Sequence, residues 1–351
     1  MNGPVLLAGV LAQPRMLAAF GLTGTPDSLP GRLAGGGRAG IDRDGWPRRV
    51  AGQGSIDAMR VMPNAALLRY AAVMGLAVQD GILGLGNGEA EGDPQPDLAA
   101  AIARHILAAP ADQPAEEIAR RLPVIGVWAD SELRGAGSPH SGVPLVERRT
   151  PDDVQIVGQD EPYAGFFSVR VCHLRHRTHA GGMTPTLRRE ALVSGDAVVL
   201  LPWDPVRDRV LLIEQFRVAP LLRRDPQPWL LETVAGRVDA GETVEDAARR
   251  EAREEADLTV TRLFPAIHHY PSPGILGEYL YLYVGIADLP DGIEGVHGLE
   301  TEAEDIRGHL IPRADLTRMA MDGRLTNGPL AMIALWLELR QDAIRAELGL
   351  A

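Results

Sequence analysis

After about residue 152, the alternation of hydrophobic and polar positions predicts a series of β-strands that ends in a long helix. Alternation of this kind is typical of a strand with one buried face, and a polar turn such as DPVRD separates the two strands of a hairpin. The predicted strands are 166–177, 195–217 (two strands around that turn), 228–236, 278–287 and 303–312. Residues 327–348 are predicted to form an amphipathic C-terminal helix. Mixed strands with helices on both faces of the sheet indicate an α/β/α sandwich.

Another helix is predicted from Thr243 to about Ala256, and its acidic residues lie on an unexpected face. Thr243 is a suitable N-cap, because an acidic residue follows it three positions later. At about 100° per residue, one apolar stripe runs along this helix, and it comprises Val244, Ala247, Ala248 and Ala252. Glu251 and Glu255 fall within roughly 20° of the centre of that stripe, and Glu254 falls at its edge.

A carboxylate on the inward face of a helix is unfavourable unless it is paired or binds a metal. Glu251 and Glu255 are four residues apart, so their Cβ atoms are roughly 6 Å apart and the two side chains can share one site. Hard divalent cations such as Mg²⁺ prefer carboxylate oxygens together with water and phosphate oxygens. The residues alone leave two interpretations open, a solvated helix held by Glu–Arg pairs and a divalent metal site.

The spacing of this segment resembles the Nudix box, G-x5-E-x7-R-E-U-x-E-E-x-G-U, in which U is an aliphatic residue. Gly236, Glu242 and the run 250–255 (REAREE) match six of the seven fixed letters. The difference is Asp257, which stands where the family has a glycine that ends the helix. Asp tolerates the left-handed conformation better than most residues, at a cost of roughly 1 kcal/mol. The difference therefore concerns how the helix ends and not the metal ligands.

Composition and charge narrow the range of functions. A length of 351 residues is sufficient for two domains. The net charge of −12 argues against non-specific nucleic-acid binding, which needs a basic surface. Cys172 is the single cysteine, so no internal disulfide is expected and a reducing cytoplasm fits. No apolar run approaches the roughly 20 residues of a membrane span, and the opening MNGPVLLAGVLAQPR is predicted to contain a buried strand and not a signal peptide.

The segments on either side of the box resemble the bacterial ADP-ribose pyrophosphatases of the Nudix superfamily, from about residue 160 to about residue 340. The matching segments are FFSV, GGMTPTLRRE, VVLLPWDPVRDRVLLIEQFR, PWLLETVAGRVDAGE, SPGILGE, GVHGLETEAEDIRGHLI and NGPLAMIALWL. The resemblance implies hydrolysis of ADP-ribose to AMP and ribose 5-phosphate with Mg²⁺, or with Mn²⁺ in its place. It also implies a domain-swapped homodimer, which the sequence itself does not show.

The same resemblance implies which residues bind the metal and catalyse the reaction. The implied metal ligands are the backbone carbonyl of Ala235 and the carboxylates of Glu251, Glu254 and Glu255, with Glu254 either a ligand or an acid beside the metal. Two or more metals bridged by the diphosphate would neutralise its charge and activate a water. The acidic loop LETEAED would supply the general base, either Glu302 or Glu304. Without the flanking match, the same loop is interpreted as a solvated surface loop.

Six further residues are implied to bind the substrate, namely Arg189, Glu190, Arg217, Ser272, Gly274 and Glu278. Arginine suits a diphosphate because its planar fork donates two parallel hydrogen bonds. Glu190 can accept from an adenine amino group or a ribose hydroxyl, and the turn SPGILGE would bring Glu278 to the terminal ribose. The alternatives are a surface salt bridge for the charged residues and a plain hairpin turn for SPGILGE.

The first half of the chain resembles the γ-glutamylcyclotransferase-like (AIG2-like) fold, a smaller α+β domain. The segments that carry this resemblance are AGVL at 8–11, GRLAGGGRAGIDRDGWPRRV and GSIDAMRVMPNAALLRYAAVMG. Where that family has its catalytic acid, this chain has Ala72, and a methyl group cannot abstract a proton. The predicted domains are therefore an inactive 1–144, ending in the linker GAGSPHSGVP, and a Nudix domain 152–351. This pairing of domains resembles a bacterial group associated with tellurite resistance.

Three alternative functions remain open at this point. The first is a hydrolase of another nucleoside diphosphate sugar, because the box acts only on the diphosphate. The second is a sensor that binds ADP-ribose without turnover; intact Glu251, Glu254, Glu255 and Glu302 argue against it. The third makes the N-terminal domain the active one, and Ala72 argues against it. A partner is expected among nucleoside diphosphate sugars, with no nucleic acid and no membrane.

Overall fold

The computed structural model describes residues 3–138, 143–298 and 305–350. The chain divides into two compact units. Unit 1 comprises Met1–Arg189 together with Asp239–Gly241, and unit 2 comprises Glu190–Val238 and Glu242–Ala351. A compact unit reflects contacts in one structure, whereas a domain is defined by its ability to fold independently. The domains 1–144 and 152–351 therefore stay a prediction.

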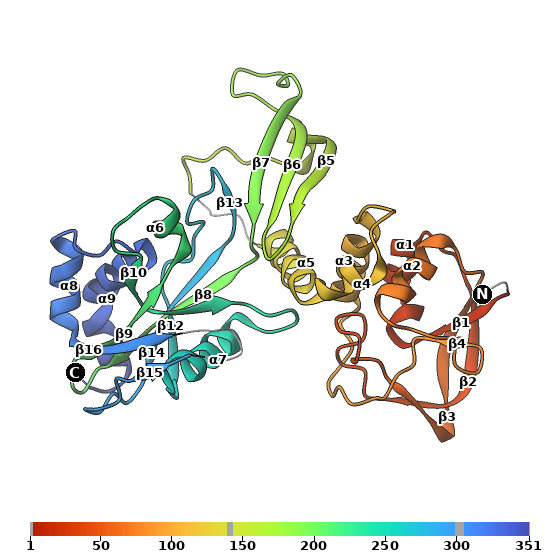
Figure 1. Ribbon diagram of the computed structural model, residues 1–351, viewed down its shortest axis with the longest axis horizontal. Helices are drawn as coiled ribbons and strands as arrows, with labels where there is room; N and C mark the ends of the chain where they lie inside the picture. The colour runs from red at the N-terminus through yellow and green to blue at the C-terminus, as the bar shows by residue number, and fades with distance from the viewer. Residues whose placement is uncertain (1–2, 139–142, 299–304, 351) are drawn as a thin grey trace. The chain divides into compact units, whose positions relative to one another are not determined.

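Unit 1 begins with a mixed sheet of order β2-β3-β1-β4 that is accompanied by helices (Figure 1). Its strands are β1 Val5–Ala8, β2 Thr25–Ala34, β3 Arg48–Val61 and β4 Ile82–Leu83. Its helices are η1 Gly9–Ala12, α1 Pro14–Phe20, α2 Ala65–Val73, α3 Pro96–Ala108, α4 Ala115–Arg120 and α5 Leu122–Gly137. β1 confirms the strand that was expected in the opening apolar stretch, and Leu7 within it is fully buried. Ala72, which stands where a catalytic acid was sought, is exposed on α2.

A separate four-stranded sheet has the order β13-β7-β6-β5. Its strands are β5 Val154–Ala164, β6 Ser168–His176, β7 Leu187–Val193 and β13 Leu276–Gly277, and the turn η2 Pro151–Asp153 precedes β5. β6 confirms the alternating strand predicted at 166–177. β7 and β13 run parallel and pair Leu192 with Leu276, so the turn SPGILGE lies beside the strand that carries Arg189 and Glu190.

The main sheet of unit 2 has eight strands, six of them in the order β12-β14-β8-β9-β16-β15 (Figure 1). The strands are β8 Ala197–Asp204, β9 Arg209–Phe216, β10 Trp229–Glu232, β11 Val234–Arg237, β12 Arg262–Pro265, β14 Leu280–Ile286, β15 Val296–His297 and β16 Ile306–Pro312. The helices are α6 Val218–Leu222, α7 Val244–Ala256, α8 Arg313–Met321 and α9 Gly328–Glu347. The β14–β8 pair is parallel and the β9–β16 pair antiparallel, so the sheet is mixed as predicted.

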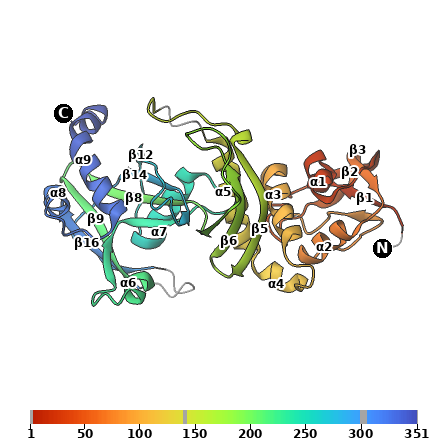
Figure 2. The same cartoon turned by 90° about the horizontal axis from the view of Figure 1, so that it is seen from above.

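Alternate residues of β8 enter two different hydrophobic cores, which makes unit 2 a three-layer sandwich. Val198 and Leu200 pack in one cluster with the alanines of α7. Val199, Leu201 and Trp203 pack in the other cluster with residues of α8 and α9, such as Leu316 and Leu337. Figure 2 shows the strands between α7 and α9. The predicted α/β/α sandwich is confirmed, and α9 confirms the predicted C-terminal helix.

The segment 228–236 was predicted as one strand, and this was wrong in one respect. It forms two strands with different neighbours, since β10 pairs with β9 and β11 pairs with β8. β8 and β9 pair with each other only near their turn, at Trp203–Val210 and Asp204–Arg209, so the incoming chain fills the gap between them. The chain crosses from one neighbour to the other at Thr233, whose hydroxyl donates to the carbonyl of Leu200.

Among the helices that the structure describes, none has both the length and the apolar character needed to cross a bilayer.

Candidate active site

The helix of the motif, α7, begins and ends as the sequence predicts. The Asp246 backbone N–H donates to the Thr243 hydroxyl oxygen at 3.1 Å, so Thr243 is the N-cap. The alanines of the apolar stripe are buried against the sheet, and Ala247 and Ala252 have no exposed surface. Asp257 ends the helix in the left-handed region with φ 51° and ψ 36°, and its N–H donates to the carbonyl oxygens of the last turn.

Asp257→Gly is expected to stabilise the protein by about 0.5–1 kcal/mol without changing activity. Glycine adopts a positive φ without the clash that a Cβ causes, and this gain exceeds the extra entropy of glycine in the unfolded chain. Urea unfolding of the wild type and the variant measures the difference in the free energy of unfolding. An unchanged or lower stability would show that Asp257 is not strained at its observed φ.

Glu251 and Glu255 face the sheet from α7 and are buried, with 9% and 3% of their surface exposed. Glu255 Oε2 accepts a hydrogen bond of 2.9 Å from the backbone N–H of Ala235 on β11. The Glu254 side chain is 30% exposed, in agreement with its expected place at the edge of the stripe. Charged side chains are rarely buried in this way without a specific role. The expectation of inward-facing carboxylates on this helix is therefore confirmed.

Gly236 on β11 lies directly beneath the Glu251 carboxylate. A Cβ at position 236 would approach both Cδ and Oε1 of Glu251 far closer than 3.0 Å, a distance that real Cβ atoms essentially never show. The glycine of the motif therefore leaves room for the Glu251 carboxylate in its observed position between helix and strand, and a Cβ there would push the carboxylate aside. The positions of Gly236 and Glu251 in the motif are therefore linked, since the small residue at 236 makes room for the side chain at 251.

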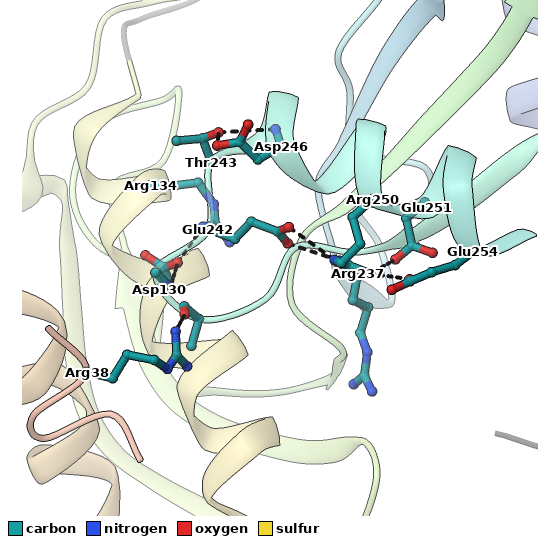
Figure 3. Close-up of polar contacts among 12 residues, drawn as sticks. Arg38, Asp130, Arg134, Arg237, Glu242, Thr243, Asp246, Arg250, Glu251 and Glu254 are labelled. Atoms are coloured by element: carbon teal, nitrogen blue, oxygen red, sulfur yellow. Dashed lines mark hydrogen bonds and ion pairs between the residues drawn. The ribbon is translucent and has the colours of Figure 1, made fainter. Parts of the chain in front are cut away.

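Arg250 holds three acids of the motif in place, Glu242, Glu251 and Glu254 (Figure 3). Its Nε and Nη2 donate to the two oxygens of Glu242 at 3.1 and 3.0 Å. Its Nη1 donates to Glu251 at 2.7 Å and to Glu254 at 2.9 Å, and Nη2 also reaches the Arg237 carbonyl oxygen. Burial alone lowers the pKa of Arg250, but Glu242 and Glu251 outweigh it and raise that pKa above its ordinary value. The guanidinium thus stays charged and fixes three carboxylates.

The donor set beside β11 has the chemistry of a divalent metal site. Glu251, Glu254 and Glu255 offer carboxylate oxygens, which are the ligands that hard divalent cations prefer. Over the described ranges 3–138, 143–298 and 305–350, no three His, Cys, Asp or Glu side chains surround one point closely enough to form a finished metal cage. Two of the acids are turned to the Nη1 atom of Arg250. The chemistry of the three acids therefore fits a divalent cation, whereas their positions in the described structure do not surround one, because Arg250 binds two of them and neutralises part of their charge.

Glu278 lies at the end of the SPGILGE turn, where its Oε1 accepts a hydrogen bond of 3.1 Å from the Ser194 hydroxyl. Burial raises the pKa of Glu278 above its ordinary value of 4.5; Ser194 opposes this effect and the charge of Asp196 adds to it. Ser194 and Asp196 are themselves buried, at 5% and 4% exposed. Sequence reasoning missed both, although they lie in the short polar run SGD between two apolar strands.

Glu278→Gln is expected to gain stability relative to the wild type as the pH rises above about 4.5. Because the folded pKa of Glu278 is raised, its proton stabilises the folded state fully below the unfolded pKa, and this contribution is lost as the pH rises through the folded pKa. Glutamine stays neutral and keeps an acceptor for Ser194. Urea unfolding of both proteins at pH 4 and pH 8 measures the effect, and an equal difference at the two pH values would contradict it.

Arg217, predicted to bind the substrate, is ion-paired in the structure with a glutamate that sequence reasoning missed. Its Nε and Nη2 donate to Glu232 Oε2 at 3.0 and 2.7 Å. Glu232 is 6% exposed, and it also accepts from Gln215 and from Asn327. The Arg217 side chain remains 41% exposed. The pair therefore holds the arginine in one orientation and leaves surface on it for a ligand. An acid inside the apolar run PWLLETVAG was the available signal.

The remaining predicted residues lie in several places. Arg189 and Glu190 are exposed on β7, where Arg189 Nη1 donates to the Arg188 carbonyl oxygen. Ser272 accepts two backbone hydrogen bonds at the start of its turn, and Gly274 is exposed two residues later. Glu302 and Glu304 lie outside the described residues. The structure thus places Glu255 against Ala235 and Glu251 with Glu254 on Arg250, and it places the substrate candidates on other strands and turns.

Known proteins resemble this chain over the part that contains the site. The NUDIX domain family matches residues 194–330. An ADP-ribose pyrophosphatase of Escherichia coli (strain K12) is 43% identical over 196 residues, which are 56% of this chain and 93% of that protein. An ADP-ribose pyrophosphatase of Haemophilus influenzae is 36% identical over 55% of this chain and 90% of its own length. A GDP-mannose pyrophosphatase of Enterobacter sp. (strain 638) is 30% identical over 46% of this chain and 83% of its own length.

Proposed function

The chain belongs to the Nudix hydrolase family, and from this premise we propose that it hydrolyses ADP-ribose to AMP and ribose 5-phosphate. The metal is Mg²⁺, with Mn²⁺ able to replace it. The observation that carries the proposal is the buried carboxylate pair of α7, Glu251 and Glu255, held against β11 in a family of divalent-metal-dependent enzymes. The identity of 43% to a protein named ADP-ribose pyrophosphatase, across nearly its whole length, supports the choice of substrate.

Each group of residues has a distinct part in this reaction. The Ala235 carbonyl oxygen and the carboxylates of Glu251, Glu254 and Glu255 would hold the metal. Before the metal binds, Arg250 would orient Glu251 and Glu254. A bound divalent cation neutralises diphosphate charge and makes a coordinated water more acidic.

On the substrate side, Arg217 would donate to phosphate oxygens from the orientation that Glu232 gives it. Arg189 and Glu190 would bind the nucleotide, and Glu278, with Ser272 and Gly274 in the same turn, would bind the terminal ribose. Glu302 or Glu304 would accept the proton of the attacking water.

A second substrate class has support from one observation. A GDP-mannose pyrophosphatase is 30% identical to this chain over 162 residues, so the scaffold also occurs with another nucleoside diphosphate sugar. Both substrates contain the diphosphate that the metal site would engage, and they differ in base and in second sugar. Residues that contact the second sugar decide between them, and Glu278 with its raised pKa is the one to compare.

Three further features of the proposal concern the whole chain. Residues 1–144 form an inactive cyclotransferase-like domain, and residues 152–351 form the Nudix domain. The inactivity of the first domain is supported by Ala72 on α2, which stands where a catalytic acid would be needed. The protein acts as a homodimer. It works in the cytoplasm, which the single cysteine, Cys172, supports.

The test is incubation of the purified protein with ADP-ribose and Mg²⁺, with AMP measured by chromatography and GDP-mannose tested alongside. AMP that appears with Mg²⁺ and not with excess chelator is the expected result. A faster reaction with GDP-mannose would move the proposal to the second substrate class. Tight binding of ADP-ribose with no product would identify a sensor and overturn the proposed hydrolysis.

A further inference from the structure

The loop that joins the first glycine of the motif to Glu242 is held by side chains of the first half of the chain. Asp239–Gly241 belong to unit 1. Asp130 Oδ2 on α5 accepts a hydrogen bond of 2.9 Å from the Gly241 backbone N–H. Arg134, one helical turn later, donates to the same oxygen at 2.8 Å. Arg38 Nη1 donates to the Ala240 carbonyl oxygen at 3.2 Å. The backbone of the loop thus has a side-chain partner at two successive residues.

The loop is also closely packed against the residues around it. Ala240 is 6% exposed, and its methyl group lies where a side chain at Gly126 of α5 would be, since a Cβ there would come within 2.8 Å. Gly241 has φ +80°, and a Cβ on it would come within 2.7 Å of the Gln95 amide nitrogen. The absence of a Cβ at Gly126 and at Gly241 therefore allows the loop to pack this closely, and any change that loosens the packing exposes buried surface.

We propose that Asp130 is a positioning residue for the metal-binding helix α7. It fixes the Gly241 N–H, and the next residue, Glu242, carries the carboxylate that binds two nitrogens of Arg250. Arg250 in turn donates to Glu251 and Glu254. Figure 3 shows these contacts from Asp130 through Glu242 to the acids of the helix. The inference rests on the proposed function only for what the helix binds.

The influence of Asp130 on α7 depends on the strength of its hydrogen bond to the loop. Asp130 is a charged acceptor with a side chain 14% exposed, so its hydrogen bond to Gly241 is stronger than one between neutral groups. Without it, the loop residue before Glu242 loses its fixed amide, and Glu242 can move away from Arg250. An unfixed Arg250 leaves Glu251 and Glu254 free to change rotamer. Residues that orient metal ligands in this indirect way typically change metal affinity or activity by about 10–100-fold when removed.

The experiment compares Asp130→Ala, Asp130→Asn and the control Asp112→Ala, an exposed aspartate of the same unit. Asparagine keeps a carbonyl oxygen that can accept from Gly241 and removes the charge that pairs with Arg134. Three quantities are measured on the full-length protein: hydrogen exchange of the segment 239–244, Mn²⁺ affinity by electron paramagnetic resonance without substrate, and kcat and KM with ADP-ribose. Thermal melting of each variant shows whether it is folded.

Asp130→Ala is expected to speed exchange in 239–244, to weaken Mn²⁺ binding about tenfold and to lower kcat about tenfold with little change in KM. Asp130→Asn should recover most of each loss, and Asp112→Ala should match the wild type. Faster exchange with unchanged Mn²⁺ affinity would overturn the inference, and so would an Asp130→Asn variant as impaired as Asp130→Ala. If the wild type fails to hydrolyse ADP-ribose, the proposed function fails, and the exchange and Mn²⁺ measurements still decide the role of Asp130.

Discussion

Glu255→Gln is expected to lower kcat for ADP-ribose by at least about 10³-fold, because a metal ligand supplies several kcal/mol of transition-state stabilisation. The carboxylate of Glu255 is the most deeply buried acid of α7, and it lies against the Ala235 N–H at 2.9 Å. Glutamine has the same shape and keeps an oxygen that accepts from this N–H. The substitution therefore removes charge and one oxygen of the proposed metal site while it preserves the local packing.

Stability separates this prediction from simple unfolding. The free energy of unfolding of Glu255→Gln should stay within about 1 kcal/mol of the wild type, as for other substitutions that preserve shape and hydrogen bonding. The measurements are steady-state kinetics with Mg²⁺ and urea unfolding without it. Glu117→Gln is the matched control, since Glu117 is an exposed glutamate on α4. A Glu255→Gln enzyme that keeps more than about a tenth of wild-type kcat would contradict a metal site on α7.

The helix that carries the site could be predicted from local sequence. Thr243 supplies the N-cap, the alanines form one stripe at helical spacing, and both features depend on residues within a few positions of each other. The inward position of Glu251 and Glu255 follows from the same spacing, so the buried carboxylates could also be predicted. The left-handed end at Asp257 followed from the family pattern combined with the conformational tolerance of aspartate.

Interactions between distant residues could not be predicted in this way. The run 228–236 alternates like a single strand, and only the separation of β8 from β9 beyond their turn makes it change partners at Thr233. The orientation of Arg217 depends on Glu232, whose buried position involves Asn327 from the far end of the chain.

Loop positions add a second limit. Asp130 and Gly241 are 111 residues apart, and nothing in the local pattern of either predicts their hydrogen bond. The predicted base, Glu302 or Glu304, lies outside the described residues, so its role stays a prediction that rests on the family resemblance alone.

Gly236→Ala is the second substitution with a large expected effect, a loss of about 10²-fold in kcat together with weaker metal binding. The added methyl group would overlap the Glu251 carboxylate, which is the far end of a flexible side chain and can move aside. Glu251 would then leave its place between α7 and β11, while the backbone of both elements remains. Overpacking of this kind typically lowers stability by about 1–3 kcal/mol, so the variant should fold.

A double-mutant cycle shows whether this loss acts through Glu251. If it does, Gly236→Ala combined with Glu251→Gln should be no slower than Glu251→Gln alone, because the carboxylate whose displacement slows the reaction has already been replaced by a neutral amide. Gly135→Ala is the steric control, since Gly135 is helical, exposed and has no atom within 4 Å of an added Cβ. Losses from Gly236→Ala and Glu251→Gln that multiply in the double variant would contradict the steric role of Gly236. The first glycine of the motif would then act on the site through the backbone of β11 and not through the room it leaves for Glu251.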